Sequence, residues 1–502
     1  MRIIAIHCII TLITKAPWLP NGELDTDDLG RMLFSIRGIL FHQLVFSNRE
    51  YEIEQFNIGF KTSIKSPGQS GNTKLIMIDR AKSPLIKDAI EFNLRLKPYE
   101  KFVLDNGVEM YAINAGAQEV LQVEMVFYAG NSYETQKGVA AATNYMLRNG
   151  TTTKTAFQIN EHFEYFGAYC NRTCYNETAV VSLHTLSKHL KELLPVMREM
   201  ITDSVFPETE LEIFKQNSQQ KLSVSLQKCD FVANRLIDAY LYGEQHPYGK
   251  YLVAEDYESL TTESMKEFFQ QYYLKGSVVI FVAGNLPADL FEQLNKQFGD
   301  LSITSNSELP TTNLFLPASQ KKYRVANDPN GVQGAIRMAR PFPNRQHPDY
   351  MNVMVLNTVL GGFFGSRLMS NIREDKGYTY GIHSYVQNHI HESAWMISTE
   401  AGKDVSKATV EEVYKEMKLL REELIDEEEL LLVRNYMIGS ILGDLDGPFQ
   451  IIGRWKNIIL NKLDEQYFYD SIKTIKTISA SELMNLSQKY LQPDDFYELV
   501  VV

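Results

Sequence analysis

The sequence is poor in cysteine, in long apolar runs and in excess positive charge, and each shortage excludes a class of protein. Four cysteines in 502 residues are too few for the disulfide framework of small secreted domains. No run of about 18 apolar residues, the length needed to cross a membrane, is present. The net charge of −12 leaves no basic stripe for nucleic acid. The sequence therefore predicts a soluble protein that binds neither nucleic acid nor membranes.

The chain is too long for one ordinary domain, so we expect at least two domains with sizeable cores. Residues 1–76 lack sustained periodicity. They are predicted to be a poorly ordered extension, or to precede a natural start at Met77. The apolar stretch Ile3–Ile13 weakly resembles a signal peptide but lacks a convincing cleavage pattern. A cytoplasmic location is therefore expected, with export to the periplasm as the alternative.

Strong patterning begins near residue 99 and predicts short strands that alternate with long helices. Phe102–Ala112 is typical of a hairpin, because the turn sequence DNG lies between apolar residues. Val120–Ala129 alternates apolar with polar residues, as a half-buried strand does. Ser277–Ala283 is continuously apolar and rich in β-branched residues, which predicts a buried strand.

The second half repeats this plan. A strand, a helix, a strand, a helix and a terminal strand are predicted at Gly331–Arg340, Tyr350–Leu360, Glu392–Ala401, Ser406–Glu423 and Tyr497–Val502. The shared order predicts a duplicated α+β unit, in which helices cover antiparallel-rich sheets. We place the two domains at residues 77–305 and 321–502, with a linker at 306–320.

The most specific motif is the segment LGGFFGSRLMSNIREDKGYTYGIHS, residues 360–384, with its glycines and the spacing from Arg373 to Tyr380. It is similar to the C-terminal signature of the insulinase/pitrilysin metallopeptidases, which include mitochondrial processing peptidases. The resemblance implies that Arg373 and Tyr380 hold the substrate backbone and stabilise the developing oxyanion, since both donate hydrogen bonds to carbonyl oxygen. The alternative is that Arg373 forms a salt bridge near its helix end and Tyr380 packs in the next strand.

A second segment, GVAAATNYMLRNGT at residues 138–151, resembles the zinc-binding helix of the same family without its catalytic side chains. In the family motif H-x-x-E-H, two histidines bind zinc and the glutamate activates water. The matching positions hold Ala141, Asn144 and Tyr145, and the third ligand position falls near Lys221. Alanine has no ligating atom, asparagine is no general base, and lysine is cationic. The resemblance therefore predicts no catalytic residue and no metal in this chain.

The remaining histidines do not restore a metal site. His184 and His189 are five residues apart, and His389 and His391 are two apart, whereas a helical pair of ligands is spaced by four. No cofactor is therefore predicted.

The segment Glu164–Thr178 resembles the edge strand on which active relatives lay an extended peptide through main-chain hydrogen bonds. A closed structural strand, with Tyr169 and Tyr175 in the core, is an equal alternative. The sequence does not choose between the two.

The family resemblance implies two homologous domains that form a clam-like chamber. In two-chain members, one chain carries the zinc motif, and the other lacks it but supplies the arginine and tyrosine. We therefore predict a pseudoenzyme that is inactive alone and pairs with a zinc-bearing homologue, in a peptidase that acts on peptides or unfolded polypeptides. Zinc is expected in the partner chain. The alternative is a scaffold or binding protein of the same fold with no peptidase role.

Overall fold

The computed structural model describes residues 88–303 and 315–502, all within the unit Pro84–Val502. The predicted extension, residues 1–76, lies outside the described residues together with Ile3–Ile13, so the location of the protein stays a prediction. Most of the predicted linker, 306–320, lies outside them too, and the domain boundaries also stay predictions. In the described ranges, no helix has both the length and the apolar character to cross a bilayer.

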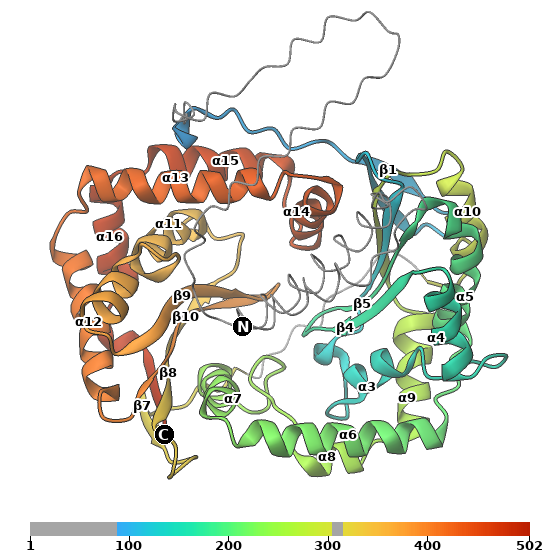
Figure 1. The fold of residues 1–502 in the computed structure, drawn as a ribbon, viewed down its shortest axis with the longest axis horizontal. Helices are drawn as coiled ribbons and strands as arrows, with labels where there is room; N and C mark the ends of the chain where they lie inside the picture. The colour runs from blue at the N-terminus through green and yellow to red at the C-terminus, as the bar shows by residue number, and fades with distance from the viewer. Residues whose placement is uncertain (1–87, 304–314) are drawn as a thin grey trace, which may run out of the picture. The chain divides into compact units, whose positions relative to one another are not determined.

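The first sheet has six strands in the order β1-β2-β6-β3-β5-β4 (Figure 1). In that order they are Glu100–Val103, Glu109–Asn114, Val278–Gly284, Val120–Phe127, Ala179–Leu186 and Tyr169–Cys174. Only β2 and β6 pair in parallel, and the other neighbours are antiparallel. The predicted β1–β2 hairpin is confirmed, and Gly107 turns there at a φ of 85°, which glycine adopts without strain.

The second sheet has five strands in the order β7-β11-β8-β10-β9. In that order they are Lys322–Val325, Tyr497–Val501, Gln333–Pro343, Glu392–Gly402 and Thr379–Asn388. Here too one pair is parallel, β7 with β11, and the others are antiparallel. The terminal strand β11 thus occupies the place of β6 in the first sheet. The predicted duplication is confirmed in both strand order and strand direction.

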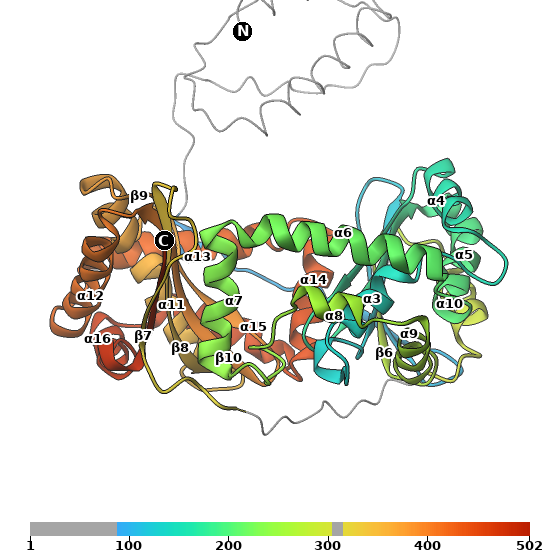
Figure 2. The same cartoon turned by 90° about the horizontal axis from the view of Figure 1, so that it is seen from below.

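Helices from the same half of the chain cover one face of each sheet, as Figures 1 and 2 show. The helices that share a core with the first sheet include α4 (Ala156–Tyr165), α5 (Leu190–Thr202), α9 (Thr262–Phe269) and α10 (Leu290–Phe298). Those that share a core with the second include α11 (Tyr350–Gly361), α12 (Ser406–Glu422) and α16 (Ala480–Tyr490). This arrangement of helices on two sheets confirms the predicted α+β fold class.

The opposite face of each sheet is covered by a helix from the other half of the chain. Helix α14 (Pro448–Leu460) packs on β2 and β6 of the first sheet, and α7 (Cys229–Tyr242) packs on β8 and β11 of the second. The prediction of a half-buried strand at Val120–Ala129 was therefore wrong. Val126 and Glu124, on its second face, are both buried, because α14 packs on that side of the sheet.

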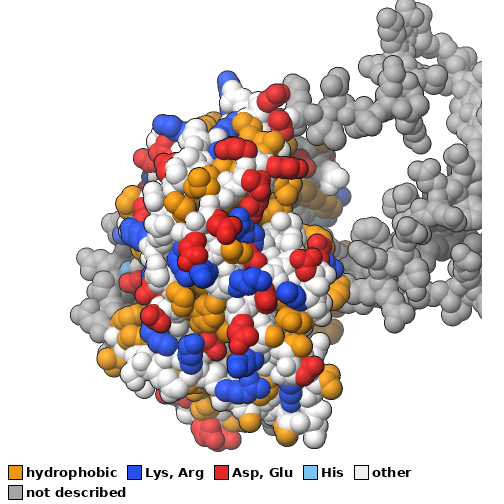
Figure 3. Space-filling view, turned by 90° about the vertical axis from the view of Figure 1, so that its left-hand side faces the viewer, with side chains coloured by type: hydrophobic (Ala, Val, Ile, Leu, Met, Phe, Trp, Pro, Cys, Tyr) orange, Lys and Arg blue, Asp and Glu red, His pale blue; other side chains and the backbone are white. Residues whose placement is uncertain are grey.

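The other α-helices of the described residues are α3 (Val139–Met146), α6 (Glu208–Leu226), α8 (Ala254–Glu258), α13 (Glu427–Gly443) and α15 (Glu465–Thr477). The face of the molecule shown in Figure 3 carries acidic and basic side chains in alternation rather than a patch of one sign. On α12, i to i+3 and i to i+4 ion pairs account for part of this mixture, Lys407 with Glu411 and Lys415 with Glu412.

Candidate functional site

Helix α3 carries the three positions that match the family's zinc motif. Ala141 is half-buried and offers only a methyl group. Asn144 is 2% exposed, and its amide donates to the Val180 carbonyl at 3.4 Å and to the Tyr273 hydroxyl at 3.1 Å. Tyr145 is 47% exposed. The asparagine is thus committed to holding α3 on β5, and only the tyrosine faces solvent.

Tyr145 lies between the aromatic ring of Phe214 and the guanidinium of Arg172. Its ring centroid is 4.9 Å from that of Phe214 on α6, and the guanidinium carbon of Arg172 on β4 is 5.2 Å from the ring centroid. Arg172 Nη1 also donates to the Tyr145 carbonyl, while Arg148 Nη1 donates to the Cys170 carbonyl at 3.0 Å. Burial lowers the pKa of Arg172 to about 10. The site is therefore cationic and aromatic.

These residues do not fit a zinc ion, which takes imidazole, thiolate or carboxylate ligands. Lys221 is exposed on α6, seven residues after Phe214. In the part of the chain that the structure describes, no group of three or more His, Cys, Asp or Glu side chains is placed to hold a metal. No step of metal-assisted hydrolysis can be assigned to Ala141, Asn144, Tyr145 or Lys221.

Arg373 and Tyr380 lie together at the edge of the second sheet. Arg373 lies in the last turn of the π-helical segment Met369–Asp375, and Tyr380 lies at the start of the edge strand β9. Arg373 Nε donates to the Tyr380 carbonyl at 2.9 Å, and the guanidinium carbon is 4.5 Å from the ring centroid of Phe364 and 5.8 Å from that of Tyr380.

The phenol of Tyr380 extends into solvent, since the residue is 78% exposed. The alternative in which this ring packs in the strand is therefore wrong, although Arg373 does approach Glu374, with Nη1 3.5 Å from Oε1. The arginine and the tyrosine meet each other and Phe364. Among the described residues, their hydrogen bonds, ion pairs and ring contacts stay within the second half of the chain.

Among the residues that the structure describes, β4 is one of the two edge strands of the first sheet and pairs only with β5. Tyr169 is 63% exposed and Tyr175, just after the strand, is 56% exposed. The alternative that placed these two tyrosines in the core was therefore wrong. An edge position with unpaired main-chain groups is what β-addition of a peptide requires.

A buried polar cluster around His389 was not predicted from the sequence. Its ring stacks on Tyr248 with centroids 4.0 Å apart, and Nδ1 lies 3.3 Å from Asn176 Nδ2. The Tyr248 hydroxyl donates to Glu177, which also accepts from the Ile390 amide at 3.2 Å. Burial lowers the pKa of His389 to about 4. The cluster links the β4–β5 turn to the β9–β10 turn. A tertiary contact of this kind leaves no pattern in the local sequence.

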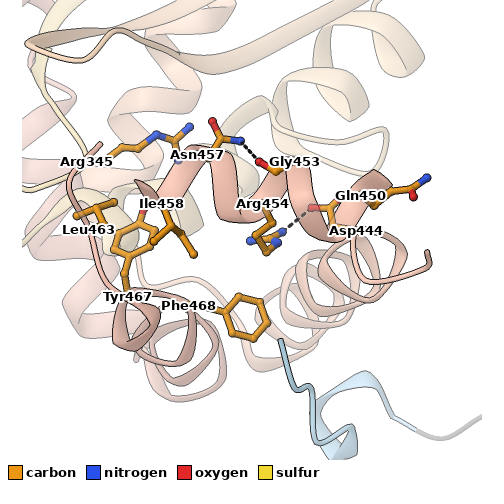
Figure 4. Close-up of a pocket in the computed structure, with 10 residues that line it drawn as sticks. All are labelled: Arg345, Asp444, Gln450, Gly453, Arg454, Asn457, Ile458, Leu463, Tyr467 and Phe468. Carbon is orange, nitrogen blue, oxygen red and sulfur yellow. Dashed lines mark hydrogen bonds and ion pairs between the residues drawn. The ribbon is translucent and has the colours of Figure 1, made fainter. Parts of the chain in front are cut away.

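Two cavities lie near this region, and neither contains a residue singled out by the zinc motif or the Arg373–Tyr380 motif. One, of about 460 Å³, is lined by residues that include Glu177, His389 and Lys456. The other, of about 350 Å³, lies beside α14 (Figure 4). There Arg454 is already paired with Asp444 at 2.5 Å. We therefore build the candidate site on the sheet edges rather than on these cavities.

Two sequence profiles of one peptidase family match the chain. The profile described as "Insulinase (Peptidase family M16)" matches residues 110–249, which include α3 and β4. The profile described as "Peptidase M16 inactive domain" matches residues 259–437, which include Arg373 and Tyr380. Both segments of the candidate site thus lie inside matched regions.

Individual relatives and a solved structure match the chain over most of its length. "Uncharacterized zinc protease YmxG" of Bacillus subtilis is 25% identical over 354 residues, which are 69% of this chain and 84% of that protein. The human "Mitochondrial-processing peptidase subunit beta" is 21% identical over 457 residues, 86% of this chain and 91% of that protein. A crystal structure of a peptidase M16 inactive domain from Pseudomonas fluorescens shares the fold, with a TM-score of 0.71 at 24% identity over 80% of this chain and 98% of that one.

Proposed function

Because this chain belongs to the insulinase family of M16 peptidases, we propose that it is a non-catalytic member that pairs with a zinc-bearing homologue and supplies contacts to a peptide substrate. One observation carries the proposal. The metal-ligand positions of the family hold Ala141, Tyr145 and Lys221, whereas Arg373 and Tyr380 remain together at an exposed sheet edge.

The geometry of this pair suits a donor site for carbonyl oxygen. The hydrogen bond from Arg373 Nε to the Tyr380 carbonyl fixes the orientation of the guanidinium, which still has other N–H groups to donate. Because Tyr380 is exposed, its hydroxyl can reach a bound chain. Donors held in place before a substrate arrives stabilise developing negative charge without reorganisation. In the proposed complex, the partner supplies the metal and this chain supplies these donors.

The partner is proposed to be a homologous chain with an intact H-x-x-E-H motif, and the substrate a peptide or an unfolded polypeptide. A relative over most of the chain is named as one subunit of a processing peptidase, which supports a role beside a second chain. Extended polypeptides fit two sheets with exposed edge strands, because main-chain hydrogen bonding is largely indifferent to sequence.

The test is to purify this chain and a zinc-motif homologue encoded in the same genome, and to measure peptide cleavage and bound zinc for each alone and for the mixture. We expect cleavage by the mixture and none by this chain alone. Arg373→Ala should lower kcat of the mixture by roughly two orders of magnitude, whereas Arg95→Ala, which removes an exposed arginine outside the site, should not.

Two results would contradict the proposal. Cleavage with stoichiometric zinc in the isolated chain would show that it has its own metal centre. Equal cleavage by mixtures that contain the wild type, Arg373→Ala or Tyr380→Phe would remove the substrate contact and favour a scaffold role.

A further inference from the structure

Arg148 and Arg172 form a pair of guanidinium groups beside the edge of the first sheet. Arg148 follows α3, and Arg172 lies in the middle of β4. Each gives one N–H to a main-chain carbonyl, Arg148 to Cys170 and Arg172 to Tyr145. Neither forms an ion pair with any carboxylate of the described residues. Both positive charges therefore lie at the edge strand with no counter-ion from residues 88–303 or 315–502.

The charge on Arg172 is costly where it stands. Its Nε is shielded from solvent and has no hydrogen-bond partner within residues 88–303 and 315–502. Burial, followed by repulsion from Arg148, lowers its pKa to about 10. A guanidinium that is desolvated without a carboxylate is destabilised until an anion arrives, and the planar fork of its N–H groups matches a carboxylate in particular.

We infer that Arg148 and Arg172 bind a carboxylate group of a peptide that lies along the edge of β4. The free edge of the strand supplies main-chain hydrogen-bonding groups for an extended chain. Tyr169 and Tyr145 are exposed beside the two arginines and offer aromatic surface to neighbouring side chains. The positive charge at this edge then selects peptides whose carboxylate reaches the pair.

This inference rests on the proposed function only in taking a peptide as the ligand. It assigns a preference for a negatively charged group to a part of the chain that has lost the family's metal ligands. The carboxylate belongs either to the peptide C-terminus or to an acidic side chain, and the two sources share the chemistry that the arginines recognise.

The test measures binding of fluorescent peptides to the full chain by anisotropy, without a partner and without cleavage. One sequence is prepared with a free C-terminus, with an amidated C-terminus, and amidated with one internal glutamine replaced by glutamate. At least one of the two carboxylate forms should bind roughly tenfold to a hundredfold more tightly than the neutral amide, and the form that does so identifies the source.

Arg172→Gln should abolish that preference, while the exposed control Arg95→Gln should keep it, as a cycle between the ligand carboxylate and Arg172 requires. If Arg172→Gln does not fold, as judged by thermal melting, Arg148→Gln must weaken the preference instead. Equal binding of all three peptides to the wild type would overturn the inference, as would a preference that survives both substitutions. Neither result bears on cleavage by the two-chain mixture, so the proposed function is tested separately.

Discussion

The two sheets share a strand order, but the equivalent strands β3 and β8 bury charges of opposite sign. In β3 the charge is Glu124, which pairs with Lys456 of α14 at 2.6 Å. In β8 it is Arg337, which pairs with Asp230 of α7. In both cases the partner lies on a helix from the other half of the chain. Each sheet is therefore held to its covering helix by an ion pair, which we call a tie. The sheet contributes the negative charge in one tie and the positive charge in the other.

The residues at the edges of the two sheets differ more than those in the two ties. At the edge of the second sheet, Arg373 donates a hydrogen bond to the Tyr380 carbonyl at the start of β9, and at β4 the main chain of α3 at Tyr145 accepts a hydrogen bond from Arg172. A tie in the interior is maintained by the cost of an unpaired buried charge. The exposed side chains at the edges, such as Tyr169 and Tyr380, are under no such constraint. The residues of the two ties hold the fold, whereas the exposed residues at the sheet edges are available to a ligand.

The largest effect is expected from breaking the tie of the second sheet. Asp230→Ala should lower the free energy of unfolding by about 3 kcal/mol, because the guanidinium of Arg337, with 2% of its side chain exposed, would be left without a counter-ion. Urea denaturation of both proteins measures the difference. Arg337→Met in the Asp230→Ala background should recover most of the loss. A single variant as stable as the wild type would show that α7 is not held by this pair.

The pH dependence of stability should separate two buried groups at the same interface. Burial lowers the pKa of His389 to about 4, below its unfolded value of about 6.5. Its contribution is therefore present above pH 6.5 and is lost as the pH falls to 4. Burial raises the pKa of Asp238 to about 7, above its unfolded value of about 3.9. Its contribution is present below pH 3.9 and is lost as the pH rises to 7.

The two contributions oppose each other, so the variants should diverge. As the pH rises from 4 to 7, the free energy of unfolding of Asp238→Asn should increase by on the order of 2 kcal/mol relative to wild type. As the pH rises from 4 to 6.5, that of His389→Gln should decrease by a similar amount relative to wild type. Unfolding free energies measured across this range give the two difference curves, in which titrating groups that interact with neither residue cancel to first order. Parallel curves would contradict the opposite shifts.

Many strands and helices of this fold could be predicted because buried positions produce a recognisable pattern of apolar residues along the sequence. The continuous apolar run of β6 is buried along its whole length, and the terminal strand β11 is buried at every position except the half-buried Glu498. The covering helices could not be assigned in the same way. The apolar face of α7 indicates that it packs, but not that it packs on the sheet of the other half. That choice depends on tertiary contacts such as Arg337 with Asp230.

The residues of the candidate site also differ in whether the sequence could predict them. Arg373 and Tyr380 were found because a fixed spacing in one motif brings them together. Arg172 was not singled out, since one cation in an edge strand is typical of a solvated residue. Its importance comes from the approach of β4 to α3, which places it against Tyr145 and shields its Nε from solvent. A sequence contains no local signal of that approach.

Breaking the tie of the first sheet should cost less. Lys456→Met should lower the free energy of unfolding by about 1 kcal/mol, because Glu124 keeps the hydrogen bond from Gln122 Nε2 at 3.1 Å and Lys456 is already partly exposed. Urea denaturation again gives the value. Adding Glu124→Gln to this variant should restore stability, since the buried charge is then gone. A loss as large as that of Asp230→Ala would show that the two ties are equal in strength.

The smallest effect on stability is expected at the exposed edge of the second sheet. Tyr380→Phe should change the free energy of unfolding by less than about 0.5 kcal/mol, because the removed hydroxyl belongs to a residue that is 78% exposed. The matched control is Tyr350→Phe, which removes a buried hydroxyl that donates to Asn388 Oδ1 at 2.7 Å and should cost about 1 kcal/mol. Thermal or urea unfolding of both variants measures this contrast. If Tyr380→Phe were as destabilising as Tyr350→Phe, the phenol would be part of the scaffold, and its retention would need no substrate to explain it.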